Sequence, residues 1–371
     1  MIDDRYPIHH PEEILSPSLV IFIDRVRRNL DAMVDLAGEV GRLRPHVKTH
    51  KMPALIRMLE SRGISKHKVA TIAEAEMVAQ AGGTDVLIGY PIVGPNLARF
   101  AKLVETYPST TFRVTVDHPD SARGLSDALK EASRPTPVLV DLEIGMGRTG
   151  IAPGDPAFDL YQLVAGLPNL VPDGLQAYDG QIRDLDPADR QKSAAPGIEA
   201  VHAFRDRLLA AGLPVNRLVL GGTPTFPIHA RDETPGVECS PGTCVLHDAG
   251  YASKFPDLPF EPAALMFTRV VSQPRPGRVC LDLGHKAIAA DPVGPRLTLL
   301  GLADATLGGQ SEEHLVVDSP AADDLAPGAA LLAIPTHICP TCALHSWAYV
   351  IEGGEVVDRW EVQARDRVLG I

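Results

Sequence analysis

The amino-acid sequence predicts an α/β protein in which a (β/α)₈ TIM-type barrel is followed by an all-β domain. Between residues 18 and 250, short apolar segments alternate with longer amphipathic segments, which is the pattern of parallel strand–helix units. After residue 250, strand-like segments follow one another without long helices between them. A chain of 371 residues also exceeds one ordinary small domain. We therefore expect residues 18–250 to form the barrel, and residues 1–17 with 251–371 to form the β domain.

The barrel region contains eight strand candidates, and helical spacing of apolar residues follows the early ones. The expected barrel strands are residues 18–23, a segment that ends at 44–48, and then 69–71, 85–88, 111–116, 138–142, 174–178 and 218–220. The alternative is a doubly wound open sheet, but no G-x-G-x-x-G motif follows the first strand. The expected strands of the β domain are residues 267–272, 279–283, 297–300, 315–318, 330–334, 347–351 and 356–360.

Composition and charge restrict the class of partner. The hydrophobic content of 45% and charged content of 22% are those of an ordinary globular protein. The net charge of −12 argues against nucleic acid or an anionic membrane as the main partner. The N-terminus has no signal-peptide core, and no apolar run approaches the roughly 20 residues of a membrane span. Five cysteines do not indicate a disulfide framework, so we expect a cytoplasmic protein.

The most unusual stretch is residues 44–51, RPHVKTHK. In a strand, alternate side chains share a face, so Arg44, His46 and Lys48 are expected to point the same way. Burying unpaired cations is costly, and this face therefore needs an anionic partner. Neighbouring cations also favour the neutral form of a lysine, which an imine-forming lysine requires. The alternative is a solvated basic edge, with Pro45 marking the start of the strand.

Several loops at the predicted carboxyl ends of barrel strands carry residues suited to ligand binding. Residues 145–150, GMGRTG, combine glycines with the fixed cation of Arg148, although a loop with one exposed arginine is an equally simple interpretation. The expected eighth strand precedes a glycine-rich turn that is typical of phosphate sites in barrels. The residues of that turn are Gly221, Gly222 and Thr223. Tyr178 and Asp179 lie at the end of the seventh strand candidate, and both Tyr178 and Tyr251 are equally compatible with a structural role.

Residues 335–345, PTHICPTCALH, contain a candidate metal site. In an extended segment, His337 and Cys339 lie on one face, and imidazole with thiolate favours zinc. Two protein ligands leave coordination positions open, which is typical of a catalytic site. The alternatives are a redox C-x-x-C at Cys339 and Cys342, half of a structural zinc site, or small buried residues at a strand end.

Residues 45–51, PHVKTHK, resemble the pyridoxal-phosphate lysine motif of the D-threonine aldolase and D-serine dehydratase family. The resemblance extends from Ser18 to about Trp360 and implies an alanine-racemase-like fold, pyridoxal 5′-phosphate on Lys48, and a divalent metal, Zn or Mn, on His337 and Cys339. The cofactor-binding residues that it implies are Lys48, His46, Arg148, Tyr178, Gly221, Gly222, Thr223 and Tyr251. A homodimer is implied by the family alone.

One family feature is missing. Family members often have a histidine a few residues after the tyrosine that matches Tyr178, and this sequence has Asp179, Gln181 and Asp184 in that region. We therefore expect a carboxylate such as Asp179, or a metal-bound hydroxide, to transfer the proton. The expected catalytic residues are Lys48, Tyr178 and Asp179.

The resemblance implies a lyase that acts on D-3-hydroxy amino acids. The His-x-Cys pair of this sequence, His337 and Cys339, is similar to that of zinc-dependent D-serine dehydratases. The sequence that flanks the pair is more similar to D-threonine aldolases. We favour Cα–Cβ cleavage to glycine and an aldehyde, with dehydration to a keto acid and ammonia as the alternative. An amino-acid racemase and a non-catalytic pyridoxal-phosphate-binding protein are the other hypotheses.

Overall fold

The computed structural model describes residues 3–302 and 304–371, and these residues divide into two compact units with one sheet each. The barrel unit comprises Met33–Lys48, Pro53–Gly242 and Asp366–Ile371. The β unit comprises the described residues up to Ala32, Thr49–Met52 and Thr243–Arg365. The chain therefore passes from the barrel unit into the β unit directly after Lys48.

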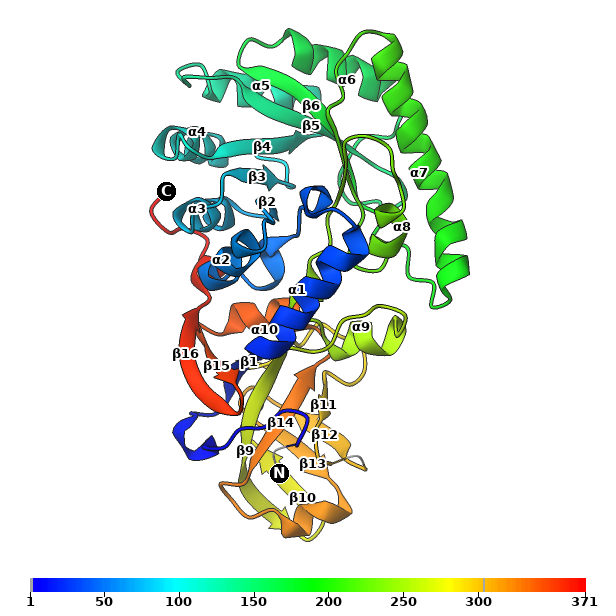
Figure 1. Ribbon diagram of the computed structural model, residues 1–371. Coiled ribbons are helices and arrows are strands. Elements are labelled where there is room, and N and C mark those ends of the chain that lie inside the picture. The colour runs from blue at the N-terminus through cyan, green and yellow to red at the C-terminus, as the bar shows by residue number, and fades with distance from the viewer. Residues whose placement is uncertain (1–2, 303) are drawn as a thin grey trace. The chain divides into compact units, whose positions relative to one another are not determined.

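Seven parallel strands form the sheet of the barrel unit, in sequence order from β2 to β8. Figure 1 labels the first five, β2 to β6. The seven strands are β2 (Lys66–Val69), β3 (Asp85–Ile88), β4 (Thr111–Val116), β5 (Thr136–Leu142), β6 (Leu170–Ala177), β7 (Arg217–Leu220) and β8 (Val237–Cys239). The segment before Lys48 reaches both edges of this sheet, because Leu43 forms a parallel bridge with Cys239 and His46 forms one with Lys68. The predicted alanine-racemase-like architecture is thus confirmed.

Helices cover the outer side of these strands (Figure 1). They are α2 (Pro53–Ser61), α3 (Ile72–Gln80), α4 (Asn96–Thr106), α5 (Pro119–Ala128), α6 (Asp155–Gly166), α7 (Pro187–Ala210) and α8 (Phe226–Ala230), and α1 (Ile23–Ala37) contributes residues to both units. At the start of α3, the Thr71 side chain accepts a hydrogen bond from Glu74 N and satisfies one of the free N–H groups of the first turn. No helix in the described part of the chain is both long and apolar enough to cross a membrane.

The β unit is built on a nine-stranded sheet. Its strands are β1 (Ser18–Phe22), β9 (Ala264–Arg275), β10 (Arg278–Leu281), β11 (Leu297–Leu299), β12 (Thr306–Gln310), β13 (Leu315–Asp318), β14 (Ala330–Pro335), β15 (Trp347–Glu352) and β16 (Glu355–Glu361). The short helices α9 (Ala249–Lys254) and α10 (Ile338–Leu344) belong to the same unit. A core cluster that includes Val20, Leu265, Phe267, Leu332 and Ile351 holds the sheet together.

Several strand predictions were wrong. Residues 18–23, expected as the first barrel strand, instead give β1, which pairs with β9 and β15 in the mixed sheet. A short apolar run does not reveal which sheet buries it. The basic stretch is not a strand, because Val47–Thr49 forms a 3₁₀ turn. The sequence patterns also missed β8 and β12, since neither contains a long apolar run.

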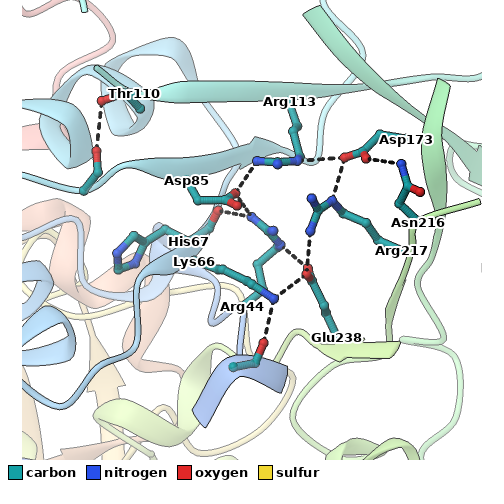
Figure 2. Close-up of polar contacts among 12 residues, drawn as sticks. Arg44, Lys66, His67, Asp85, Thr110, Arg113, Asp173, Asn216, Arg217 and Glu238 are labelled. Carbon is teal, nitrogen blue, oxygen red and sulfur yellow. Dashed lines mark hydrogen bonds and ion pairs between the residues drawn. The ribbon is translucent and has the colours of Figure 1, made fainter. Parts of the chain in front are cut away.

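A ring of charged side chains, four of them buried, lies across the barrel strands (Figure 2). Asp85 and Arg217, its two partly exposed members, are the first residues of β3 and β7. The ring runs through Arg44, Asp85, Arg113, Asp173, Arg217 and Glu238 and returns to Arg44, with N–O distances of 2.6 to 3.0 Å. The Arg44 side chain is 0% exposed, so its anionic partners are carboxylates of the protein and not a ligand. The expectation that Arg44 shares one strand face with His46 and Lys48 was wrong, because Lys48 lies in the 3₁₀ turn Val47–Thr49.

Candidate active site

Lys48 lies in the 3₁₀ turn Val47–Thr49. The residues just before this turn form one parallel bridge with β8 and one with β2. The backbone N–H of Lys48 donates to Nδ1 of His46 at 3.4 Å, which helps to fix the turn. Its Nζ is 5.8 Å from the centroid of the Tyr178 ring, and the guanidinium carbon of Arg148 is 4.9 Å from the same centroid. The structure thus brings together Lys48, Arg148 and Tyr178, which come from three separate loops.

Two glycines leave room for the Tyr178 ring. A Cβ atom on Gly180 would lie 2.3 Å from Cε1 of Tyr178, and a Cβ atom on Gly222 would lie 3.0 Å from Cε2. Cβ atoms in proteins essentially never lie 2.3 Å from another atom, the distance at Gly180, and rarely lie 3.0 Å from one, the distance at Gly222. The loop after β6 therefore accommodates the ring because Gly180 lacks a side chain, and a side chain at Gly222 would require the ring to shift.

The loop that carries Arg148 is held by Glu143. Its Oε1 accepts hydrogen bonds from the N–H groups of Gly145 and Gly147, both at 2.8 Å. These bonds stabilise the carboxylate and lower the pKa of Glu143. Gly147 has a φ of +64°, which a residue with a side chain adopts only with strain. The Gly-x-Gly-Arg loop therefore has a defined conformation, held by hydrogen bonds to Glu143.

Asp179 is buried at 3% exposure, and both of its carboxylate oxygens are occupied. Thr225 Oγ1 donates to Oδ1 at 2.8 Å, and the His229 ring Nε2 lies 2.7 Å from Oδ2. The structure thus places a histidine directly beside the residue that follows Tyr178, although this histidine comes from α8. His229 is 50 positions from Asp179 in the chain, so the sequence alone did not indicate this contact.

The glycine-rich turn and the segment after β8 are tied together, and the Ser240 hydroxyl in this region is suited to a phosphate. Gly221 has a φ of +69°, and a Cβ there would lie 2.3 Å from Cδ2 of His229. The N–H of Gly242 donates to Thr223 Oγ1 at 3.2 Å, which ties the two segments together. Ser240 Oγ is buried and has no hydrogen-bond partner among the described residues. A buried hydroxyl without a partner fits an anionic ligand group, and sequence reasoning missed Ser240.

Sequence reasoning also missed Lys68, the third residue of β2, which is only 4% exposed. A Cβ on Gly89 would lie 2.5 Å from Lys68 Cε and 2.8 Å from Gln176 Oε1, so these two side chains meet at this glycine. Gln176 Nε2 donates to Asp141 Oδ1 at 2.9 Å, while Gln176 Oε1 has no partner in the described part of the chain. β2 reads Lys-His-Lys-Val, and nothing in this largely polar strand distinguishes Lys68 from its neighbours in the sequence.

The surroundings of Lys68 favour its neutral form. Burial is the main reason that the pKa of Lys68 falls to about 7, and the positive charges of Lys48 and Arg148 act in the same direction. Asp141 opposes this shift, but burial raises the pKa of Asp141 as well. The region around Lys48 therefore contains a second buried lysine with a lowered pKa, and an anionic cofactor bound there would favour its charged form.

His337 and Cys339 are close together within the β unit. The expectation of an extended segment was wrong for Cys339, which lies in α10, while His337 is the extended residue before it. Burial alone would lower the pKa of His337, but the Cys339 side chain and Asp291 raise it to about 9. Imidazole and thiol are donors that zinc accepts. The described residues contain no group of three or more His, Cys, Asp or Glu arranged to hold a metal.

Tyr251 lies in α9 of the β unit. Its ring stacks on His247, with the ring centroids 6.2 Å apart. Asp248 begins this helix, because its Oδ1 accepts from Tyr251 N at 2.8 Å, and its Oδ2 accepts from Ile338 N at 3.1 Å. Asp248 therefore links α9 to the segment that contains His337.

Comparisons with known proteins identify the family of the whole chain. The description "Alanine racemase, N-terminal domain" matches residues 21–247, and "Putative serine dehydratase domain" matches residues 263–351. The chain is 32% identical to D-threonine aldolase of Arthrobacter sp., over 94% of this chain and 92% of that protein. It is 29% identical to 3-hydroxy-D-aspartate aldolase of Paracoccus denitrificans (strain Pd 1222), over 96% of this chain and 93% of that protein.

A solved structure shows the same fold over nearly the whole chain. The crystal structure of D-threonine aldolase from Filomicrobium marinum matches with a TM-score of 0.89 and 31% identity, over 96% of this chain and 97% of that one. Both the sequence matches and this structure cover the barrel unit and the β unit together. The chain therefore belongs to the family of alanine-racemase-fold, pyridoxal-phosphate-dependent lyases that includes D-threonine aldolase and D-serine dehydratase.

Proposed function

We propose that this protein is a pyridoxal-phosphate- and divalent-metal-dependent lyase that cleaves the Cα–Cβ bond of D-3-hydroxy amino acids, as D-threonine aldolases do. The observation that carries the proposal is the meeting of Lys48 and Arg148 at the Tyr178 ring in the barrel unit. The similarity to D-threonine aldolase over 94% of the chain supports the reaction type.

Each residue of this site has a proposed role. Lys48 holds the cofactor covalently through Nζ, and Arg148 binds an anionic oxygen of the cofactor or the substrate carboxylate. Tyr178 packs against the bound ring. The phosphate is proposed to bind at the turn of Gly221, Gly222 and Thr223, with the buried Ser240 hydroxyl as a donor. His46 and Tyr251 complete the proposed cofactor set. When bound, the cofactor supplies an electron sink for charge that develops at Cα.

Asp179 is proposed to position other residues of the site. Thr225 and His229 each engage one of its oxygens and the residue is buried, so its access to a substrate proton is restricted. Its proposed effect is to hold the turn at Gly221 and the start of α8 in place. This assignment differs from direct proton transfer, which the sequence pattern favoured.

His337 and Cys339 are proposed to bind the divalent metal. When bound, the metal supplies a Lewis acid that lowers the pKa of a substrate hydroxyl. Zinc is the metal that this donor pair favours, and manganese is the alternative. Two protein ligands leave positions for water and substrate, as in catalytic sites. The same pair is compatible with a dehydratase, which expels the hydroxyl instead of cleaving the carbon–carbon bond.

The experiment is to assay purified protein with D-threonine and with D-serine, and to record its absorbance spectrum and metal content. We expect a band at about 410–420 nm, bound zinc or manganese, and glycine with acetaldehyde from D-threonine. Lys48→Ala is expected to lose both the band and the turnover. Lys192→Ala is the control, because this lysine is 77% exposed on α7.

The other outcomes separate the alternatives. A keto acid and ammonia from D-serine, without cleavage of D-threonine, would favour the dehydratase. Interconversion of D- and L-amino acids without bound metal would favour a racemase, and a yellow protein without turnover would favour a carrier. A colourless protein that takes up no cofactor would contradict the proposal. We also propose a cytoplasmic homodimer, and light scattering after size-exclusion chromatography tests the dimer.

A further inference from the structure

The imidazole of His337 is held by a carboxylate outside the predicted metal-binding pair. Nδ1 of His337 lies 2.6 Å from Oδ2 of Asp291, which comes from the segment between β10 and β11. The two side chains are 39% and 53% exposed, respectively. Asp291 precedes His337 by 46 positions, so the contact depends on the fold of the β unit and not on local sequence.

This contact fixes which ring nitrogen is left for a cation. A carboxylate accepts the proton on Nδ1, so the lone pair of the neutral ring is on Nε2. The side chain of Cys339 interacts with the same imidazole. With Nδ1 engaged by Asp291, Nε2 and the Cys339 sulfur form the donor pair. Histidine ligands of metals almost always donate their other ring N–H to such an outer group.

A bare histidine–carboxylate pair would not support this inference. His9 and Glu355 form a similar pair at 2.8 Å in the same unit, with side chains that are 56% and 54% exposed. Such exposed pairs contribute little to stability. The pair at His337 differs because its imidazole also interacts with a cysteine two residues later.

We propose that Asp291 is a positioning residue of the metal site, which orients His337 and fixes the tautomer that binds the cation through Nε2. The inference rests on the proposed metal-dependent function and extends it to a residue outside the metal-binding pair. Loss of an outer carboxylate typically weakens metal binding by about 10- to 100-fold. Asparagine keeps one acceptor oxygen without the charge, so we expect Asp291→Asn to weaken zinc binding less than Asp291→Ala does.

The experiment measures zinc affinity by competition with a chromophoric chelator for the full-length, cofactor-loaded protein. The wild type is compared with Asp291→Ala, Asp291→Asn and Glu355→Gln, and His337→Ala serves as the reference for a lost ligand. We expect about a 10- to 100-fold loss for Asp291→Ala and no loss for Glu355→Gln. The melting temperature of the metal-free protein is measured in parallel, and we expect it to be the same for Asp291→Ala and the wild type.

Each contrary result has its own meaning. Unchanged zinc affinity in Asp291→Ala would overturn the inference and leave the proposed function intact. A metal-free Asp291→Ala that melts well below the wild type would assign Asp291 a structural role, and would also overturn the inference. A wild type that binds no zinc and no manganese would contradict the metal-dependent function itself. In that case His337→Ala would not change the metal content either.

Discussion

Thr49 Oγ1 lies 3.2 Å from Cys339 Sγ, so the residue that directly follows Lys48 in the chain is in hydrogen-bonding contact with a proposed metal ligand. Thr49 is fully buried, and both residues belong to the β unit. A second hydroxyl, that of Thr243, lies 3.7 Å from the same sulfur. A thiolate that binds a metal is commonly stabilised by such donors.

Replacing Thr49 by valine is therefore expected to weaken metal binding. The substitution keeps the shape of the side chain and removes the shorter hydroxyl contact to the sulfur. We expect zinc affinity to fall by about 10-fold, measured by chelator competition. Thr243→Val is the matched comparison, and its longer contact predicts a smaller loss. Equal affinities for both variants and the wild type would show that neither hydroxyl supports the ligand.

Lys68→Met is expected to stabilise the protein without cofactor and to weaken cofactor binding. Burial depresses the pKa of Lys68 to about 7 in the folded state, well below its ordinary value. The wild type therefore gains stability as pH rises from about 7 toward 10, because the unfolded chain alone retains the proton at higher pH. Lys68→Met removes this dependence, which chemical denaturation at pH 7 and pH 9 measures.

Cofactor affinity, followed by absorbance, tests the functional half of the Lys68 prediction. A methionine preserves most of the side-chain volume but not the charge, so we expect weaker uptake of pyridoxal phosphate. A variant that unfolds at pH 7, or binds the cofactor as the wild type does, would show that Lys68 has only a structural role.

Arg44→Met is expected to destabilise the protein strongly, because it leaves Asp85 and Glu238 without their buried partner (Figure 2). Burial alone would raise the pKa of Glu238, but Arg44 and Lys66 lower it to about 2, which shows how strongly the cations hold this carboxylate. Breaking a buried pair on one side typically costs about 3–5 kcal/mol. Lys66→Met is the control, since Lys66 is 25% exposed and its loss is expected to cost about 1 kcal/mol or less. Urea denaturation at pH 7 measures both values.

His247→Phe is expected to make the protein more stable at acidic pH. His247 is 1% exposed, neither ring nitrogen has a partner among the described residues, and burial lowers its pKa to about 4. The unfolded chain therefore binds a proton between about pH 6.5 and 4 that the folded protein does not. This difference reduces the free energy of unfolding by up to about 3 kcal/mol below pH 4.

The neighbouring Asp248 has the opposite linkage, because burial raises its pKa to about 6 and it contributes stability as pH falls. In the wild type the two effects oppose each other between pH 6 and 4. In His247→Phe the contribution of Asp248 remains alone, so stability is expected to rise as pH falls through 6. Thermal melts at pH 7, 6, 5 and 4 measure this. Parallel curves for the two proteins would exclude a contribution from His247.

The fold class could be predicted from the sequence because it depends on periodicity. The family and the clustering of Lys48, Arg148 and Tyr178 could be predicted because they depend on short motifs. The sequence did not reveal that β1 belongs to the mixed sheet, since apolar strands look alike in either sheet. Lys68, Ser240, His229 and Asp291 were missed for another reason. The residues that contact or bury each of these side chains lie far away in the sequence.

The central position of β1 in its sheet also affects how the protein is made. On the ribosome, residues 33–242 of the barrel unit emerge before any of the strands that β1 pairs with. The backbone of Ser18–Phe22 must wait for Ala264–Arg275 on one side and for Trp347–Glu352 on the other. A nascent chain therefore carries an apolar strand without partners through most of its synthesis, and unpaired strands of this kind are prone to aggregation. Slow, low-temperature expression is accordingly the condition under which we expect the highest yield of folded protein.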